Sequence, residues 1–147
     1  AVDEIRICPS DQLGELRFRG QGTSYTLNGY LSSEARPAFD NRRKMIAMSK
    51  SIVAFELSEE KDKGAAKTQN PADIDVFNDH VHSFDWFKTS NITAKKVFQV
   101  IRAEVAVDRH QGTSHFLYAD GHVELIDAQQ ISHWADEGFN FARPPAF

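Results

Sequence analysis

The sequence predicts an α+β fold built on an antiparallel β-sheet, in a single domain that spans residues 1–147. Three observations favour this fold. Short apolar runs of strand length are separated by turn residues. An Asp-Gly pair lies between two segments of alternating hydrophobicity, as in a β-hairpin. A helical pattern with a capping signal then follows. A chain of 147 residues can bury about two thirds of its unfolded surface, so it needs neither a metal nor a disulfide to hold one domain together.

The composition is that of an ordinary globular protein and argues against binding to nucleic acids. Hydrophobic residues make up 41% of the chain, charged residues 26%, and the net charge is −4. A surface that binds the phosphate backbone needs clustered basic residues, and the sequence has one such cluster, Arg42-Arg43-Lys44. The sequence contains no run of 18 apolar residues, which is the length that a membrane-spanning helix needs. We therefore expect no nucleic-acid partner.

The sequence of residues 1–41 predicts short strands that alternate with loops. Residues 1–8 are expected to form a short strand that ends at a proline, and residues 12–23, with three glycines, a loop. Residues 24–31 remain open between a strand and a turn-rich segment. Residues 32–41 are polar and predict another loop.

The middle of the chain contains one well-defined strand. Residues 52–55 form a β-branched apolar run that ends at Glu56, which is typical of a buried strand. The charged segment 58–72 predicts a flexible loop. Residues 101–107 alternate in hydrophobicity and predict a half-exposed strand, although residues 97–101 also fit helical spacing, so the start of that strand stays open.

The hairpin is predicted by Asp120-Gly121, which lies between the alternating segments 115–119 and 122–126. Both residues tolerate positive φ, so we expect a two-residue type I′ turn. Pairing counted outward from that turn gives one apolar face that should lie against the interior. This face consists of Phe116, Tyr118, Val123 and Leu125.

A helix is predicted directly after the hairpin. Asp127 is followed three residues later by Gln130, which resembles a capping box. The helix is therefore expected over residues 128–137, and Gly138 should end it.

A longer string around the hairpin is more specific than the hairpin itself. It consists of His110, nine residues, and then Asp120-Gly121. This string resembles the C-terminal H-x9-D-G motif of a large family of bacterial prepilin-type proteins, abundant in planctomycetes. Further segments follow in the family's order, namely Cys8-Pro9-Ser10-Asp11, Ser24-Tyr25-Thr26-Leu27-Asn28 and residues 49–56. The residues that carry the resemblance are Cys8, Pro9, Tyr25, Asn28, Glu56, His110, Asp120 and Gly121.

The resemblance implies the head domain of a pilin-like protein whose N-terminal helix is absent from this chain. The abrupt start at Ala1 fits that expectation. The implied function is that of a non-enzymatic subunit or accessory of a type II secretion or type IV pilus-like filament, with other pilin-like subunits or secretion-system proteins as partners. The head would face the periplasm or the exterior, and the missing helix would anchor the precursor in the inner membrane. A structural role for His110, Asp120 and Gly121 is then expected.

The resemblance leaves calcium open, because some type II pseudopilins bind calcium in a C-terminal loop. The oxygen donors near the equivalent end are Asp108, Asp120, Glu124 and Asp127. Their spacing matches no defined calcium loop. No other cofactor and no catalytic residue is expected, and Cys8, the one cysteine, can form no internal disulfide.

Two other functions remain open. His80 and His82 would share one face of a strand, so a metal-dependent enzyme could use them with a distant acid. The further ligands considered are His110, His115, Asp120 and His122. A carbohydrate-binding module could instead use the aromatic residues of segment 77–87. These are Phe77, Phe84, Trp86 and Phe87.

Overall fold

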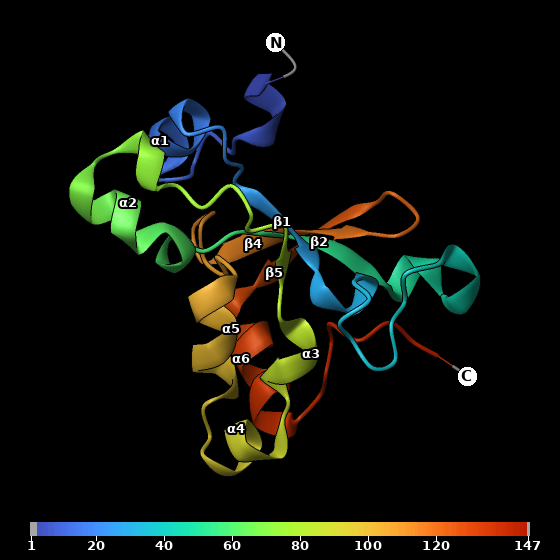
Figure 1. Cartoon of the computed structure of the whole chain (residues 1–147). Coiled ribbons are helices and arrows are strands. Elements are labelled where there is room, and N and C mark those ends of the chain that lie inside the picture. The colour runs from blue at the N-terminus through green and yellow to red at the C-terminus, as the bar shows by residue number, and fades with distance from the viewer. Residues whose placement is uncertain (1–2, 147) are drawn as a thin grey trace.

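The fold is a five-stranded β-sheet with helices packed on one side, as the computed structural model in Figure 1 shows for residues 3–146. The strands are β1 Tyr25–Asn28, β2 Ile52–Glu56, β3 His80–Val81, β4 Thr113–Tyr118 and β5 Val123–Asp127. Their order across the sheet is β3-β1-β2-β4-β5. β3 pairs with β1 in parallel, and the other three pairs are antiparallel. The predicted α+β class is confirmed, with a sheet that is mostly rather than wholly antiparallel.

The helices are short and form two groups. The α-helices are α1 Gly14–Arg19, α2 Lys63–Thr68, α3 Ser83–Trp86, α4 Thr89–Thr93, α5 Val97–Glu104 and α6 Ala128–Glu137. The 3-10 helices are η1 Asp3–Arg6, η2 Gly29–Leu31, η3 Arg42–Lys44, η4 Met48–Lys50, η5 Glu59–Asp62 and η6 Pro71–Asp73. In Figure 1, α3 to α6 gather on one side of the sheet, while α1 and α2 lie together near the N-terminus. None of the helices within residues 3–146 has the length and apolar character needed to span a bilayer.

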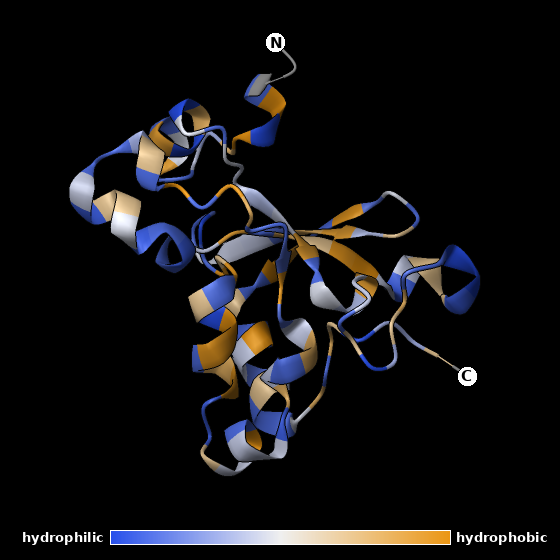
Figure 2. Cartoon of the chain, in the orientation of Figure 1, coloured by the Kyte–Doolittle hydropathy of each residue, from blue (hydrophilic) through white to orange (hydrophobic). Residues whose placement is uncertain are grey.

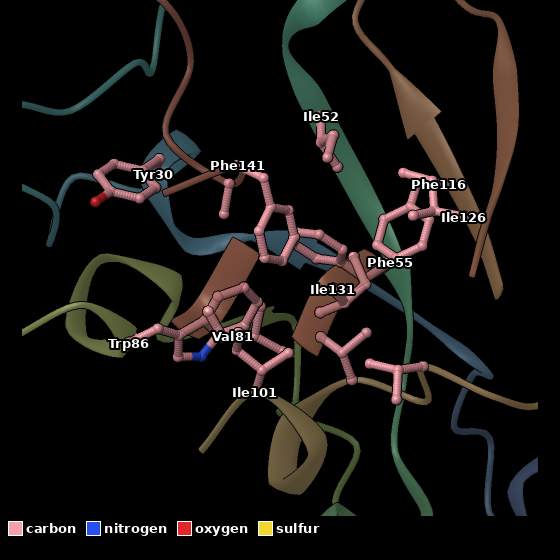
Figure 3. Packing of buried hydrophobic residues seen from close by; sticks show 14 of the residues in the cluster. Tyr30, Ile52, Phe55, Val81, Trp86, Ile101, Phe116, Ile126, Ile131 and Phe141 are labelled. Atoms are coloured by element: carbon pink, nitrogen blue, oxygen red, sulfur yellow. The ribbon is translucent and has the colours of Figure 1, made fainter. Parts of the chain in front are cut away.

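The main core lies between the sheet and the helices α3, α5 and α6 (Figure 3). Phe55 of β2 and Phe116 of β4 pack edge to face, with ring centroids 5.7 Å apart. Trp86, Ile101 and Ile131 reach this layer from the three helices, and each is fully buried. Burial of such large side chains is the main favourable contribution to folding.

The strand β2 and the helix α6 are confirmed, because each depends on a strong local signal. The side chain of Asp127 accepts a hydrogen bond of 2.7 Å from the backbone N–H of Gln129 at the start of α6. Gly138 ends the helix in the left-handed region, with φ of 71°. Segment 24–31, left open by the sequence, contains β1 and η2.

Several predicted elements are wrong. Residues 3–6 form η1 rather than a strand, and the expected loop at 12–23 contains α1. Segment 58–72, expected as a loop, contains η5, α2 and the start of η6. Most of 101–107 belongs to α5 instead of a strand. The helical spacing of Val97 and Ile101, both buried against the sheet, prevails there over the alternation.

The hairpin exists, but its turn is longer than predicted. Leu117 lies opposite Val123, and the N–H of Tyr118 donates to the carbonyl of His122, so three residues form the loop. Gly121 adopts φ of 94°, which suits a type I turn followed by a bulge. Compared with the predicted turn, the extra turn residue shifts the register of β5 against β4 by one residue. The side chains of β5 that were expected to face the interior therefore face outward. Phe116 and Tyr118 are buried as predicted, whereas Val123 and Leu125 are exposed.

Candidate functional site

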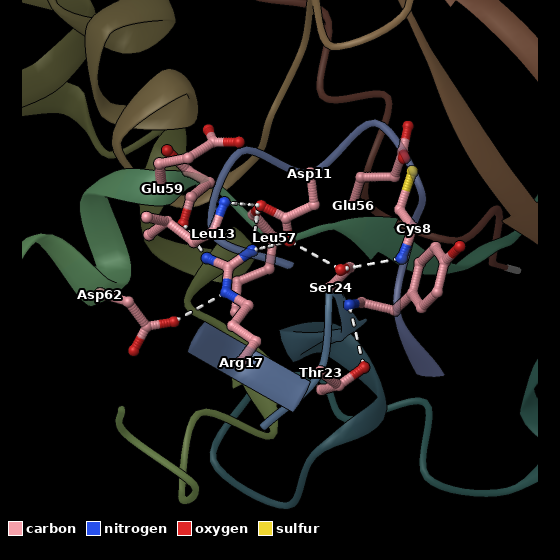
Figure 4. Close-up of polar contacts among 12 residues, drawn as sticks. Cys8, Asp11, Leu13, Arg17, Thr23, Ser24, Glu56, Leu57, Glu59 and Asp62 are labelled. Carbon is pink, nitrogen blue, oxygen red and sulfur yellow. Dashed lines mark hydrogen bonds and ion pairs between the residues drawn. The ribbon is translucent and has the colours of Figure 1, made fainter. Parts of the chain in front are cut away.

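A buried network of charges fixes the N-terminal loop to the sheet (Figure 4). Arg17 of α1 is fully buried and pairs with Asp11 and, at 3.0 Å, with Asp62. Asp11 also accepts a hydrogen bond of 2.6 Å from Ser24, whose hydroxyl in turn accepts one of 2.9 Å from the backbone N–H of Cys8. The Cys-Pro-Ser-Asp segment is therefore held against the start of β1 by charge-assisted hydrogen bonds.

Glu56, at the end of β2, is the centre of a second polar cluster and is 1% exposed. Its Oε1 lies 2.8 Å from Nε2 of His110. Its Oε2 accepts hydrogen bonds from the Ser114 hydroxyl, at 2.7 Å, and from the His115 backbone N–H, at 2.9 Å. Burial raises the pKa of the Glu56 carboxyl, but these hydrogen bonds outweigh burial and lower the pKa overall.

Four of the residues that carry the family resemblance in the sequence, Cys8, Tyr25, Glu56 and His110, lie together around this carboxylate. Cys8 Sγ lies 3.7 Å from His110 Nε2, and Tyr25 of β1 pairs with Glu56 across the strands. Pro9 follows Cys8 in an exposed turn. We call Cys8, Glu56 and His110 the Glu56 cluster. Its members are far apart in the sequence, and only the fold brings their side chains into contact.

The geometry of the Glu56 cluster does not activate Cys8 as a nucleophile. In a Cys–His–acid triad one ring nitrogen serves the thiol and the other serves the acid. Here Nε2 of His110 faces both Cys8 and Glu56. Burial also raises the pKa of the Cys8 thiol, which disfavours the reactive thiolate. The cluster instead joins the N-terminal loop, β2 and β4.

The other motif residues lie elsewhere. Asn28 is fully buried, and its side-chain amide donates to the carbonyls of Ile52 and Ala142 at 2.8 and 2.7 Å. It thus ties β1 to β2 and to the C-terminal segment. Asp120 and Gly121 form the tip of the hairpin, where Asp120 accepts a hydrogen bond from the backbone N–H of His122.

The four calcium candidates are not gathered into one site. Asp127 caps α6, and Asp108 pairs with Arg102 at 3.5 Å. Asp120 and Glu124 come nearer to each other because the ring of His122 contacts both. Among the described residues, neither group of three mutually close ligand atoms contains any of these four.

The aromatic segment 77–87 does not form a flat exposed platform. Trp86 is fully buried in the core, and Phe84 and Phe87 are partly buried against it. Phe77 alone of the four is largely exposed, at 86%. Sugar-binding sites need aromatic faces open to the ligand, so this arrangement disfavours the carbohydrate-binding alternative.

His80 and His82 do lie close together, with an acid that the sequence did not indicate. His80 Nε2 is 3.4 Å and His82 Nε2 is 4.0 Å from Oε2 of Glu34, which follows η2. None of the further ligands considered from the sequence joins them: His110 and His115 contact Glu56, and Asp120 and His122 form the hairpin tip. We call Glu34, His80 and His82 the Glu34 cluster.

The face of the sheet opposite the helices carries an apolar patch. Figure 2 shows hydrophobic residues along the β4–β5 hairpin, beyond the helical layer. Several large apolar side chains are 38% to 77% exposed here. We call this set the uncovered face: Ile5, Tyr25, Leu27, Leu117, Val123 and Leu125. Part of it surrounds an open depression of about 490 Å³.

Sequence reasoning missed three kinds of residue. Arg17 and Arg109 are buried among carboxylates, with Arg109 2.7 Å from Glu59, but isolated arginines in polar segments carry no signal of burial. Glu34 was missed because it lies 46 residues from His80. The exposure of Val123 and Leu125 was missed because a two-residue type I′ turn was predicted, whereas the hairpin has a three-residue turn.

Comparison with known proteins adds no assignment: no protein-family model matches the sequence, and neither a curated protein nor a solved structure is significantly similar to it.

Proposed function

We propose that this chain is the head domain of a pilin-like subunit or accessory of a type II secretion or type IV pilus-like filament, and that it acts by packing and protein recognition. Its partners are other pilin-like subunits, and the domain lies at the cell envelope, anchored through an N-terminal helix of the full-length protein. The observation that carries the proposal is the uncovered face, an apolar surface on a sheet whose opposite side is fully packed.

The uncovered face is more typical of a subunit that packs against other proteins than of a monomer. Leu27, Val123 and Leu125 are 51%, 55% and 61% exposed and belong to one face of the sheet. Contiguous apolar patches on soluble proteins mark surfaces that other proteins cover. Burying a fully exposed side chain of this size contributes about 1.5 to 3 kcal/mol, and roughly half of that remains to be gained at each of these half-exposed side chains.

The convergence of the motif residues also supports the proposal. Cys8, Glu56 and His110 hold the N-terminal loop beside β1, where Ile5 forms part of the uncovered face. A buried network of this kind fixes one arrangement of the chain. A filament subunit needs such a fixed surface, because every copy must present the same contacts to its neighbours.

The proposal is tested with the full-length gene product in its source bacterium. The codons upstream of Ala1 should encode a Gly-Phe-Thr-Leu-x-Glu-like cleavage site and then about 20 apolar residues, enough to cross a bilayer. The double variant Val123→Asp/Leu125→Asp should enter the sheared filament fraction about tenfold less than the wild type, because two carboxylates would be desolvated in the contact.

The matched control is Ile92→Asp on α4, a residue that is also about half exposed but lies outside the uncovered face. It should assemble like the wild type. All these proteins should remain folded at the assay temperature, which thermal unfolding checks, although Asp is unfavourable in a strand and should lower the stability of the double variant by about 1 to 2 kcal/mol. Equal assembly of the double variant, or a gene without the upstream apolar segment, would exclude the proposal.

A further inference from the structure

The Glu34 cluster brings together three side chains that commonly bind transition metals. His80 and His82 alternate on one side of β3 and the residue that follows it, so both rings turn toward the same space, with centroids 5.4 Å apart. Glu34 approaches from the segment after η2. The three ligand atoms lie within 4.8 Å of one another.

Each histidine ring is oriented by a second carboxylate through its other nitrogen. Nδ1 of His80 lies 2.9 Å from Oδ1 of Asp79, and Nδ1 of His82 lies 3.3 Å from Oε1 of Glu104. An ionised carboxylate only accepts hydrogen bonds, so each ring can donate from Nδ1 to its own carboxylate when Nε2 binds a metal. In that tautomer of the neutral imidazole the Nε2 lone pair points into the space shared with Glu34, where a metal ion would replace the proton of the contact between Nε2 and the carboxylate.

Glu104 is itself held firmly in place. Its Oε2 accepts a hydrogen bond of 2.6 Å from the indole N–H of Trp86, which is fully buried. Its Oε1 also lies 3.3 Å from Nζ of Lys61. The orientation of His82 is therefore set by groups that belong to the core. A carboxylate behind each metal-binding histidine is the usual arrangement in protein metal sites.

We propose that Glu34, His80 and His82 bind a divalent transition metal, and that Zn²⁺ is the ion that fits this donor set best. Two imidazole nitrogens and one carboxylate oxygen form a known zinc ligand set. Tetrahedral zinc needs ligand atoms about 3.4 Å apart, given bonds of about 2.0 to 2.1 Å. The separations of 3.4 and 4.0 Å from Glu34 Oε2 approach this value. The exposed Glu34 side chain can make the remaining adjustment by rotation.

The site would connect two separate parts of the chain. Glu34 lies in the segment between η2 and η3, whereas His80 and His82 lead from β3 into α3. A bound ion would tie that segment to the edge of the sheet. Three protein ligands leave a fourth position for water or for a side chain of another molecule. The proposal does not depend on the filament assignment.

The Glu56 cluster is the rival site, because it also holds three ligand atoms in close range. Both Glu56 oxygens and the facing nitrogen of His110 already have hydrogen-bond partners within the protein. Metal binding there would have to break those bonds and deprotonate a buried thiol. We therefore expect the metal at the Glu34 cluster only.

The first experiment measures zinc bound to the full chain, purified without a histidine tag and dialysed against a slight excess of ZnCl2. The wild type should retain one equivalent, and His80→Gln/His82→Gln should retain none. The matched control His122→Gln/His133→Gln also removes two exposed histidines that contact carboxylates, and it should retain one equivalent. Circular dichroism checks that each variant is folded.

A second variant keeps the proposal testable if the double substitution disturbs the fold. Glu34→Gln changes one exposed side chain, and it should weaken zinc affinity about tenfold or more, because the neutral amide is a poorer ligand than the carboxylate. Asp79→Asn, which acts only through His80, should weaken affinity about 10- to 100-fold while leaving the stoichiometry at one. Asp136→Asn on α6 is its exposed control.

Cobalt distinguishes the two clusters directly. Co²⁺ bound by histidine and carboxylate should give visible absorption bands without the near-ultraviolet charge-transfer band of a thiolate ligand. Cys8→Ser should leave that spectrum unchanged. A thiolate band, full zinc retention in His80→Gln/His82→Gln, or no retained zinc in the wild type would overturn the proposal.

Discussion

The Glu56 cluster and the Glu34 cluster both combine a carboxylate with histidine, and the first also contains a thiol, but they differ in how the carboxylate is hydrogen-bonded. In the Glu56 cluster the carboxylate is buried and both of its oxygens accept hydrogen bonds from the protein. In the Glu34 cluster the carboxylate is exposed, and the two rings turn their Nε2 atoms toward it while their Nδ1 atoms are held elsewhere.

This difference separates a structural site from a candidate ligand site. A buried carboxylate whose two oxygens both accept hydrogen bonds from the protein stabilises the fold, and another ligand would have to displace those partners. Converging nitrogen atoms near the surface do have capacity for a further ligand. Proximity of histidine and acid residues is therefore insufficient to infer binding, and the remaining hydrogen-bonding capacity decides between the two roles.

The largest expected effect is on the Glu56 cluster. Glu56→Ala should lower the free energy of unfolding by about 3 to 5 kcal/mol, because it leaves the buried groups around it without their negative partner. Urea denaturation measures this change. The control Glu60→Ala removes an exposed acid of η5 and should change stability by about 0.5 kcal/mol or less. Similar values for both variants would mean that the Glu56 cluster contributes little.

The second effect concerns zinc and the Glu34 cluster. At a free zinc concentration about 100 times the dissociation constant, the wild type should gain about 2.7 kcal/mol of stability, and excess chelator should remove the gain. Glu56→Ala should show the same gain from a lower starting point, whereas Glu34→Gln should show little. A zinc gain that Glu56→Ala abolishes and Glu34→Gln keeps would reverse the roles of the two clusters.

The third effect is a pH dependence that belongs to the Glu56 cluster. Because the folded state lowers the pKa of Glu56 below its usual value of 4.5, the carboxylate stabilises the fold above that value. This stabilisation is lost as the pH falls through the lower pKa of the folded state. Wild-type stability should therefore decline at acid pH more steeply than that of Glu56→Gln, as urea denaturation between pH 7 and about pH 3 would measure. Parallel curves would contradict the assignment.

The smallest effect is expected at Cys8. The contact of its Sγ with His110 Nε2 is long, at 3.7 Å, and thiols form weak hydrogen bonds, so Cys8→Ser should cost about 1 kcal/mol or less. Burial raises the pKa of this thiol, so iodoacetamide should alkylate the folded protein at pH 8 far more slowly than the urea-unfolded chain. Fast alkylation of the folded protein would show an activated thiolate and would reopen a catalytic role for the Glu56 cluster.

Local signals account for the parts of the fold that the sequence predicted correctly. The apolar run before Glu56 and the cap at Asp127 act within a few residues, so β2 and α6 follow from them. The segment 101–107 shows the limit of such signals. It fits two periodicities, and only the packing of Ile101 against the sheet selects the helix.

Long-range contacts account for most of what the sequence did not predict. Arg17 of α1 pairs with Asp62, which lies 45 residues away in the sequence. No local pattern indicates that pair. The Glu34 cluster joins residues 46 positions apart. Cys8, Tyr25, Glu56 and His110 were grouped in the sequence only by their resemblance to one family. That the fold places them around one carboxylate was not predicted.

The three-residue turn gives the interval between His110 and Asp120 a geometric meaning. His110 contacts Glu56 at the base of the hairpin, and β4 then runs to Tyr118 before the chain turns back. Removing one residue from β4 would exchange its inner and outer side chains, placing Leu117 where Phe116 now packs. Removing two would preserve the faces and draw the tip about 6.6 Å closer to Glu56. The number of residues between His110 and Asp120 therefore sets the distance of the hairpin tip from Glu56, and only insertions or deletions of two residues would keep the buried side chains of β4 on the same face.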